Sequence, residues 1–325
     1  MAEPPARPPA ARFTLSPRAF RGVALAAVVA LTLTIVSGAA VRLTGSGLGC
    51  STWPDCTRTS LVAPLQFHAW VEFGNRLINA VVTVASIGAF VAALRRRPRR
   101  RDLTLLSLGL VVGLLLEVVV GGLVVLSKLA PWLVSIHFLL GLAFLAVAVV
   151  LHQRAGVPDG HVVAEPMVGR VPMGLARLMT ALLGVVVTLG TVVTSTGPHG
   201  GSPGTPRYGF SLHAVAQLHG TSVETFLVVT LVTLWTLAHT AAPAPVMRRA
   251  QILLGALVAQ AAVGYTQYFD HDPVGLVALH VAGASLLVIA EVRFYMGLWD
   301  RRQPPSAVVE AAPGDAVAGA ELSPA

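Results

Sequence analysis

The chain has 325 residues, of which 54% are hydrophobic and only 12% are charged, and its mean hydropathy is +0.73. These values exclude an ordinary water-soluble globular domain, in which about a quarter of the residues are charged. The formal net charge of +8 would suit a nucleic-acid-binding protein. The basic residues, however, cluster at the ends of apolar segments, so we interpret them as a signal of membrane topology and expect no nucleic-acid partner.

Eight apolar runs are long enough to cross a bilayer as helices, because about 20 residues span its hydrocarbon core. Arginines cluster in the N-terminal arm and at every second segment end, which places both termini in the cytoplasm by the positive-inside rule. We therefore predict an all-α protein of the plasma membrane, embedded in the lipid bilayer. The predicted spans are 21–42, 67–94, 103–126, 133–151, 175–196, 212–239, 249–268 and 274–298.

The first run follows basic residues and ends near small residues at 37–40, as a cleaved signal peptide would. It is too long for a signal peptide, and its Thr44-Gly45 end resembles the Thr196-Gly197 end of the fifth run, so we keep it as the first helix. The ends of the chain are rich in Pro and Ala, which predicts disordered cytoplasmic tails at 1–20 and 299–325.

The two halves of the chain carry the same polar pattern, in which a polar residue precedes a glycine and then a histidine at fixed spacing. The pattern is Glu117, Gly121, His137 in the first half and Gln260, Gly264, His280 in the second. Four helices per half make the repeat a parallel one. We predict two pseudo-symmetric four-helix bundles, at 21–151 and 175–298, joined by a cytoplasmic linker at 152–174.

Polar groups in apolar membrane helices are expensive and usually functional. His219 and His280 lie at matching depths near the outer ends of their helices, and Asn75 and His137 occupy the equivalent positions of the first half. Imidazoles suit haem iron, so we predict a haem site in each half, toward the extracytoplasmic side. For a single membrane histidine the alternative is an interhelical hydrogen bond. Water-exposed histidines are the simpler interpretation near helix ends, at His68, His213 and His271.

The outer loop at 43–66 is rich in glycine and contains the only two cysteines, Cys50 and Cys56. Both lie on the oxidising side of the membrane, so we expect a disulfide, either as a structural staple or with a redox role. The third outer loop, at 197–202, is expected to cover the second site.

Two membrane carboxylates are candidates for chemistry. Glu72 lies on the helical face of Asn75, and its i+4 neighbour is Arg76. The pair is either a structural ion pair or a functional carboxylate beside the first site that stabilises a cationic intermediate or moves protons; we favour function. For Glu117, a proton-transferring group and an interhelical hydrogen bond remain open.

These residues carry a family resemblance over about 20–298. The motifs are Arg42–Cys50 with Trp53-Pro54 and Cys56, Glu72–Arg76, Gly121-Gly122, Gly197–His199, Leu218–Gly220 and Leu279-His280. Together they resemble the haem A synthase family. The resemblance implies an eight-helix membrane oxidoreductase that oxidises the C8 methyl of haem O to the formyl group of haem A, for a terminal oxidase.

The resemblance also implies roles for particular residues. A haem b cofactor would sit on His219 and His280. Haem O would bind at His137, with Asn75, Arg76 and, more weakly, His68 contributing to its site; Glu72 would be the catalytic carboxylate, and Cys50–Cys56 the loop disulfide. Haem O synthase, terminal oxidase subunits and a second copy of the chain are the candidate partners.

The sequence departs from the family pattern at two places. Asn75 stands where the family usually has histidine, and the cysteine pair that some members carry in the second outer loop is absent. A neutral amide is a poor iron ligand, so we expect His137 alone to hold the substrate iron, with His68 as the alternative second ligand.

Two other functions remain open: a di-haem b, quinol-linked electron-transfer cytochrome, and a haem or small-molecule transporter. The parallel repeat counts against the transporter. The grouping of Glu72 and the loop cysteines around one site favours an enzyme over the cytochrome.

Overall fold

The computed structural model describes residues 14–160 and 163–301, so most of the two predicted tails, 1–13 and 302–325, lies outside the described residues. The described chain forms eight long helices, as predicted. They are α1 (Pro17–Leu43), α2 (Phe67–Arg95), α3 (Arg101–Leu126), α4 (Pro131–Ala155), α5 (Arg170–Thr196), α6 (Leu212–His239), α7 (Ala244–Phe269) and α8 (Val274–Met296). All eight are long and apolar enough to cross a membrane.

The helices extend past the predicted apolar runs, mainly at the end where the arginines lie. α1 begins at Pro17 because the side chain of Ser16 caps it, accepting the N–H of Ala19 at 3.2 Å, and because proline is favoured in the first turn. The predicted tail at 1–20 is therefore too long. α5 and α7 also begin before the predicted spans, since capping and backbone geometry, not hydrophobicity, set where a helix starts.

The linker and the predicted C-terminal tail meet in a small strand pair. β1 (Glu165–Pro166) pairs antiparallel with β2 (Trp299–Asp300), with Glu165 opposite Asp300. The predicted linker at 152–174 is shorter in the structure because α4 and α5 extend into it, and the tail predicted from 299 begins with ordered residues. These two short strands are the only departure from an all-α fold among the described residues.

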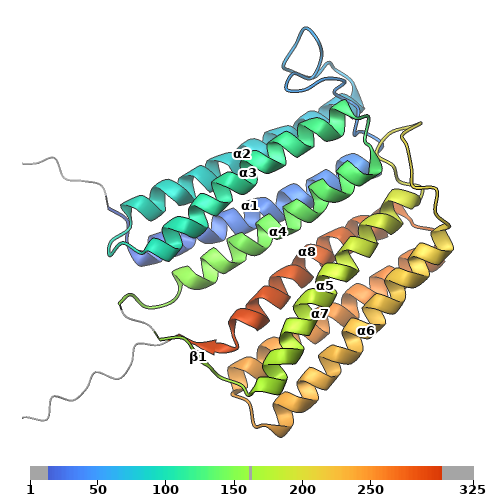
Figure 1. The fold of residues 1–325 in the computed structure, drawn as a ribbon. Helices are drawn as coiled ribbons and strands as arrows, with labels where there is room; N and C mark the ends of the chain where they lie inside the picture. Colours follow the sequence, from blue (N-terminus) through green and yellow to red (C-terminus); the bar gives the residue numbers. More distant parts are fainter. Residues whose placement is uncertain (1–13, 161–162, 302–325) are drawn as a thin grey trace, which may run out of the picture.

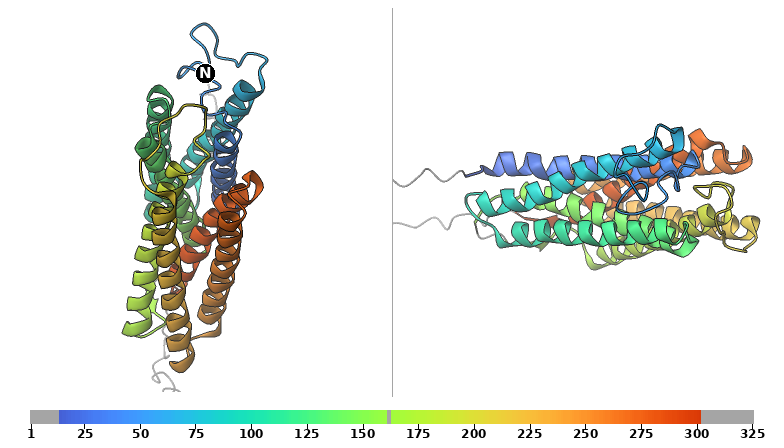
Figure 2. Two further views of the ribbon diagram at one scale, coloured as in Figure 1. Left: turned by 90° about the vertical axis from the view of Figure 1, so that its right-hand side faces the viewer. Right: turned by 90° about the horizontal axis from the view of Figure 1, so that it is seen from above.

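The helices form two four-helix bundles that run side by side, α1–α4 and α5–α8 (Figure 1). Within each bundle consecutive helices pack together and the last helix packs against the first. α4 and α8 form most of the contact between bundles, with α1 and α5 contributing. Figure 2 shows that the eight helices run along one long axis. This arrangement confirms the parallel repeat of two bundles.

Each bundle has its own core of interlocking apolar side chains. Phe20, Leu103 and Leu145 are fully buried in the first bundle, and Phe226 and Leu253 in the second. Many other large apolar side chains point outward and remain exposed in the isolated chain. An outward apolar face is expected of helices whose surroundings are lipid.

Ionic contacts order the end of the molecule opposite the disulfide loop. The guanidinium of Arg96 is fully buried and lies 2.6 Å from Asp159, which ties the α2–α3 loop to the α4–α5 linker. Arg100 pairs with Asp102 at 2.7 Å and donates to the carbonyl of Val157 at 2.9 Å. The arginine cluster therefore has a structural role as well as the topological one that its position predicts.

Candidate functional site

The second bundle brings the imidazoles of His219 on α6 and His280 on α8 close together in an edge-on arrangement. Their ring centroids are 6.4 Å apart and their planes are inclined by 77°. A nitrogen ligand lies about 2.0–2.1 Å from a first-row metal, so two rings that hold one iron from opposite sides have centroids roughly 6 Å apart. The sequence prediction that these two helices present their histidines to a shared site is supported by this distance.

Both rings carry a buried nitrogen that makes no aligned hydrogen bond among the described residues. These atoms are Nδ1 of His219 and Nδ1 of His280, and the His219 ring also interacts with the backbone of Val186 on α5. Because Nδ1 of each ring is buried in the protein, Nε2 is the ring nitrogen left for a ligand such as iron. A haem held between the two rings fits this donor set, because neutral imidazoles are common axial ligands of haem iron.

A glycine on the neighbouring helix faces each of these histidines. A methyl group added at Gly190 of α5 would lie 3.3 Å from Cε1 of His219, and one added at Gly264 of α7 would lie 2.9 Å from Cε1 of His280. The missing side chain lets the two helices of each hairpin approach while the imidazole occupies the space between them. The spacing from Gly264 to His280, which repeats that from Gly121 to His137, therefore has a packing cause.

The first bundle repeats this arrangement. A methyl group at Gly121 of α3 would lie 3.3 Å from Cε1 of His137 on α4, and one at Gly38 of α1 would lie 3.9 Å from Nδ2 of Asn75 on α2. Each of the four helical hairpins thus places a glycine opposite a candidate ligand position. The sequence pattern revealed two of these glycines, Gly121 and Gly264. Gly38 and Gly190 were missed because a long interhelical loop separates each from its partner.

Asn75 is engaged within the protein. Its Nδ2 donates to Oγ of Ser37 on α1 at 2.8 Å, and its Oδ1 accepts from Nδ2 of Asn79 at 3.4 Å. The amide therefore serves as a polar contact between α1 and α2. This agrees with the prediction that Asn75 is a poor iron ligand.

The repeated polar residue behaves differently in the two halves. Oε2 of Glu117 lies 2.6 Å from Nδ1 of His137. The oxygen is off the direction in which that ring nitrogen would donate, so the contact is close but not an aligned hydrogen bond. In the second half, Nε2 of Gln260 donates to the backbone carbonyl of His280 at 2.8 Å. The sequence left Glu117 open between a proton-transferring group and an interhelical hydrogen bond, and it did not identify the histidine partner.

Glu72 and Arg76 both bind the outer loop. The carboxylate of Glu72 is almost fully buried; it accepts the N–H of Cys50 at 2.7 Å and pairs with Arg76 at 2.7 Å. Arg76 also donates to the carbonyls of Thr52 at 3.1 Å and Pro54 at 3.1 Å. The predicted ion pair therefore forms, and it anchors the loop to α2.

The predicted disulfide between Cys50 and Cys56 is present, and both residues are fully buried. The loop that it closes lies over the first bundle. A methyl group at Gly122 would lie 2.8 Å from Cδ2 of Trp53, so the indole packs directly on α3. Gly121 and Gly122 are thus small for two separate reasons: one faces His137 and the other faces Trp53.

The remaining outer histidines contact other polar groups. His68 is exposed, and its Nδ1 lies 2.9 Å from Oγ of Ser46. Nε2 of His199 lies 2.8 Å from the carbonyl of Asp272, and Nδ1 of His213 lies 3.0 Å from the hydroxyl of Tyr268. His271 is exposed in the α7–α8 loop, with a positive φ of 61°. These contacts show how the loops and helix ends are held together.

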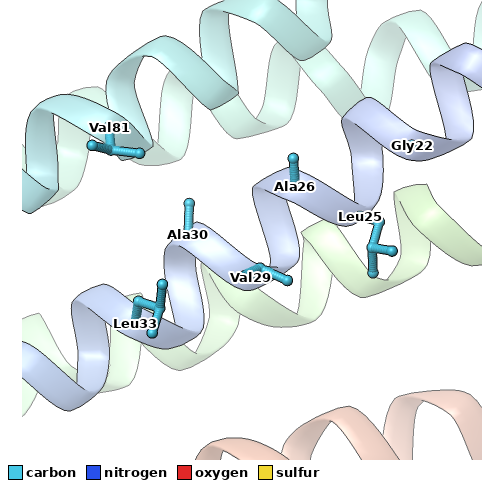
Figure 3. Close-up of a pocket in the computed structure, with 7 residues that line it drawn as sticks. All are labelled: Gly22, Leu25, Ala26, Val29, Ala30, Leu33 and Val81. Atoms are coloured by element: carbon cyan, nitrogen blue, oxygen red, sulfur yellow. The ribbon is translucent and has the colours of Figure 1, made fainter.

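Two surface grooves lie away from these positions. One, of about 410 Å³, is lined by Gly22, Leu25, Ala26, Val29, Ala30 and Leu33 of α1 and by Val81 of α2 (Figure 3). The other, of about 500 Å³, lies at the end of α7. Neither is lined by a candidate haem ligand. The first has an apolar lining on the outward face of two membrane helices, as a lipid-facing surface does.

Comparison with known proteins gives the family. Residues 21–199, more than half of the chain, match the COX15-CtaA family of cytochrome oxidase assembly proteins. The chain belongs to this family. The matched region contains the first bundle except for the first four residues of α1, together with the disulfide loop and α5, whereas His219 and His280 lie outside it.

Curated relatives of this chain include proteins named heme A synthase. One from Geobacillus kaustophilus is 34% identical over 108 residues, 32% of this chain and 33% of the relative. One from Shewanella oneidensis is 23% identical over 322 residues, 85% of this chain and 96% of the relative. A protoheme IX farnesyltransferase from Halobacterium salinarum is 32% identical over 153 residues, 45% of this chain and 33% of the relative. The chain spans about a third of the length of the first relatives that it matches.

Proposed function

We propose that this chain is a haem A synthase, which oxidises the C8 methyl of haem O to a formyl group by successive hydroxylations. The observation that carries the proposal is an asymmetry between two otherwise equivalent sites. Both bundles present a glycine-backed histidine, but only the first is covered by a disulfide loop held by Glu72 and Arg76. A substrate site and a cofactor site require such a difference, whereas the alternative di-haem cytochrome does not.

In this proposal the second bundle holds a resident haem b between His219 and His280. Bound haem supplies one-electron chemistry and connects the substrate site to electron transfer. The protein contributes two imidazoles at a fixed separation, backed by Gly190 and Gly264, within an apolar bundle that excludes water. Two strong axial ligands suit a cofactor that stays bound.

The first bundle receives haem O as substrate, with His137 as its iron ligand. Because Asn75 is occupied by Ser37 and Asn79, the opposite face of the substrate lacks an equivalent imidazole. One ligand suits a haem that must enter, react and leave. Arg76 and His68, at the same end of α2, belong to the rim of this site in our proposal.

Glu72 is the proposed catalytic carboxylate. It lies one helical turn from Asn75 and directly beneath Cys50, so it lies between the ligand positions and the covering loop. An almost buried carboxylate at this place can stabilise positive charge that develops on the substrate or accept a proton from it. Converting a methyl group and one water molecule to a formyl group releases four electrons and four protons, so the proposal requires water as the source of the oxygen atom and an external electron acceptor.

The arginine distribution supports a place for the protein in the plasma membrane, with both sites toward the extracytoplasmic side. Similarity to a protein named protoheme IX farnesyltransferase supports a farnesylated haem as the substrate class. The enzyme that makes haem O and the oxidase that uses haem A are therefore the proposed partners.

The proposal is tested by purifying the full-length protein from cells that make haem O and separating its haems by chromatography and mass spectrometry. We expect haem b together with haem O, haem A or a hydroxylated intermediate. Replacing His219 or His280 by Ala should remove most of the low-spin haem b spectrum. Finding haem b alone, with no modified haem under any condition, would support the electron-transfer cytochrome and overturn the proposal.

A further inference from the structure

We propose that Glu117 is a positioning residue for the substrate site: it holds Nδ1 of His137 and thereby directs Nε2 toward the substrate iron. This inference deepens the proposed function and rests on it, because it takes the first bundle as the haem O site. It assigns a role to a membrane carboxylate that the motif resemblance leaves without one.

The geometry of the α3–α4 hairpin carries the inference. Oε2 of Glu117 lies 2.6 Å from Nδ1 of His137, within the range of a charge-assisted hydrogen bond. The carboxylate side chain is only 15% exposed, whereas the imidazole is 41% exposed. The buried group therefore lies behind the ring, and the ring retains an open side on which a haem can bind.

Haem binding accounts for the arrangement of the two ring nitrogens. When iron occupies Nε2 of a neutral imidazole, the ring proton is on Nδ1, where a carboxylate or carbonyl normally accepts it. Nδ1 of His137 and Oε1 of Glu117 are buried and lack aligned hydrogen bonds among the described residues. A small rotation of the ring on haem binding would align Nδ1 with Glu117. The contact would then fix both the tautomer and the ring orientation.

The second half shows what happens without the carboxylate. Gln260 occupies the position equivalent to Glu117, yet its amide donates to the backbone carbonyl of His280 and leaves the ring's Nδ1 unpartnered. The two haem sites therefore differ in the group behind their α4 or α8 histidine. A carboxylate makes an imidazole a stronger electron donor to iron, so it favours the ferric over the ferrous form. We infer that the substrate haem has a lower midpoint potential than His137 alone would give it.

The test is Glu117→Gln in the full-length protein loaded with haem O without oxygen. Redox titration followed by visible and electron paramagnetic resonance spectra measures the midpoint potential of each haem. Loss of a group that hydrogen-bonds a metal-ligating histidine typically changes metal affinity by about 10–100-fold, so we expect ferric binding to weaken about tenfold relative to ferrous binding. For one electron this is an upward shift of about 59 mV. The iron–histidine stretching frequency of the ferrous substrate haem should fall in the same variant.

Three controls separate this role from a general packing effect. The haem b potential in Glu117→Gln must stay unchanged. Glu224→Gln removes an exposed carboxylate that accepts the hydroxyl of Tyr265 at 2.7 Å between α6 and α7, and it should shift neither haem potential. Glu117→Asp keeps the charge but moves the carboxylate away from Nδ1 of His137, so it should shift the midpoint potential of the substrate haem in the same direction. This variant replaces Glu117→Gln if the Gln variant does not fold.

The outcomes distinguish failure of the proposed role of Glu117 from failure of the proposed haem A synthase function. If haem O binds through His137 but neither Glu117 variant changes its potential or the iron–histidine frequency, the positioning role is wrong and the proposed function stands. If haem O does not bind to the wild-type protein in a manner that depends on His137, the proposed function fails and this inference fails with it.

Discussion

Asn75 and Glu72 show how much single residues can differ within a repeated framework. Asn75 occupies the position that is His219 in the second bundle, and it faces Gly38 as His219 faces Gly190. The sequence identified this difference correctly, because residue identity alone decides whether a ligand nitrogen is present. The sequence left the role of Glu72 open, since its contacts with Cys50 and Arg76 depend on how the loop folds back.

We predict that Asn75→His converts the substrate haem from high-spin to low-spin. Gly38 leaves space opposite the side chain, so an imidazole can replace the amide and bind the open face of the iron. Electron paramagnetic resonance of the ferric, haem O-loaded protein measures the change. If the wild-type substrate haem is already low-spin and His68→Ala makes it high-spin, then His68 is the second ligand, and its contact with Ser46 is a resting position.

For Glu72→Gln we expect haem to be retained and haem A production to be lost. The amide oxygen can still accept the N–H of Cys50, but it cannot carry the negative charge that the reaction requires. Breaking a buried ion pair costs about 3–5 kcal/mol at most, so some loss of thermal stability is also expected. Product analysis and a thermal unfolding curve measure the two effects.

Arg76→Gln is the matched variant, because it breaks the same ion pair and the loop contacts but keeps the carboxylate. If Glu72 takes part in the reaction, Arg76→Gln should still make measurable haem A even when its thermal stability is as low as that of Glu72→Gln. Equal loss of activity and stability in both variants would mean that the pair acts only by holding the loop.

At the scale of helices, the apolar periodicity predicted the number, order and approximate bounds of the elements. It could not predict that α1 begins at Pro17 or that α7 begins at Ala244, because these starting points depend on capping and on proline in the first turn. It also could not show that, in each helical hairpin, a glycine on one helix faces the candidate ligand position on the other. The contacts between α1 and α2 and between α5 and α6 join residues on either side of long loops, where sequence spacing carries no periodic signal.

We predict that Gly264→Ala displaces His280 and weakens haem b binding, whereas Gly255→Ala on the same helix does not. The added methyl at position 264 would meet the imidazole at 2.9 Å, and at position 255 it meets nothing within 4 Å. Overpacking of this kind costs about 1–3 kcal/mol. The haem b content per protein and the shape of the low-spin spectrum are the measurements. Equal haem content in the two variants would mean that the close approach of α7 is not needed to place the ring.

Across the whole molecule, the two bundles are joined, at the end that carries the disulfide loop, by contacts to backbone atoms that the sequence could not predict. The N–H of Gly47 donates to the carbonyl of Gly201 at 2.7 Å, and Arg42 at the end of α1 donates to the carbonyls of Thr194 at 2.9 Å and His199 at 2.7 Å. The third outer loop was expected to cover the second site. In the structure this loop contacts the first outer loop, so the two loops are coupled. Such contacts depend on backbone positions, which residue identity does not specify.

The last prediction concerns orientation in the membrane. Arginines lie at the α2–α3 and α4–α5 connections, and the disulfide loop lies at the opposite end of the helices (Figure 1). Positive charge is retained on the cytoplasmic side, and disulfides form on the oxidising side. Both rules place the loop after α1 outside the cytoplasm.

Single cysteines introduced into a chain with Cys50→Ser and Cys56→Ser test this orientation. Thr59→Cys and Pro158→Cys are both at exposed loop positions, at opposite ends of the helices. We expect a membrane-impermeant maleimide to label Thr59→Cys in intact cells and Pro158→Cys only after permeabilisation. The chain without cysteines gives the background. Labelling of Pro158→Cys in intact cells, with Thr59→Cys protected, would invert the topology and place both proposed haem sites toward the cytoplasm.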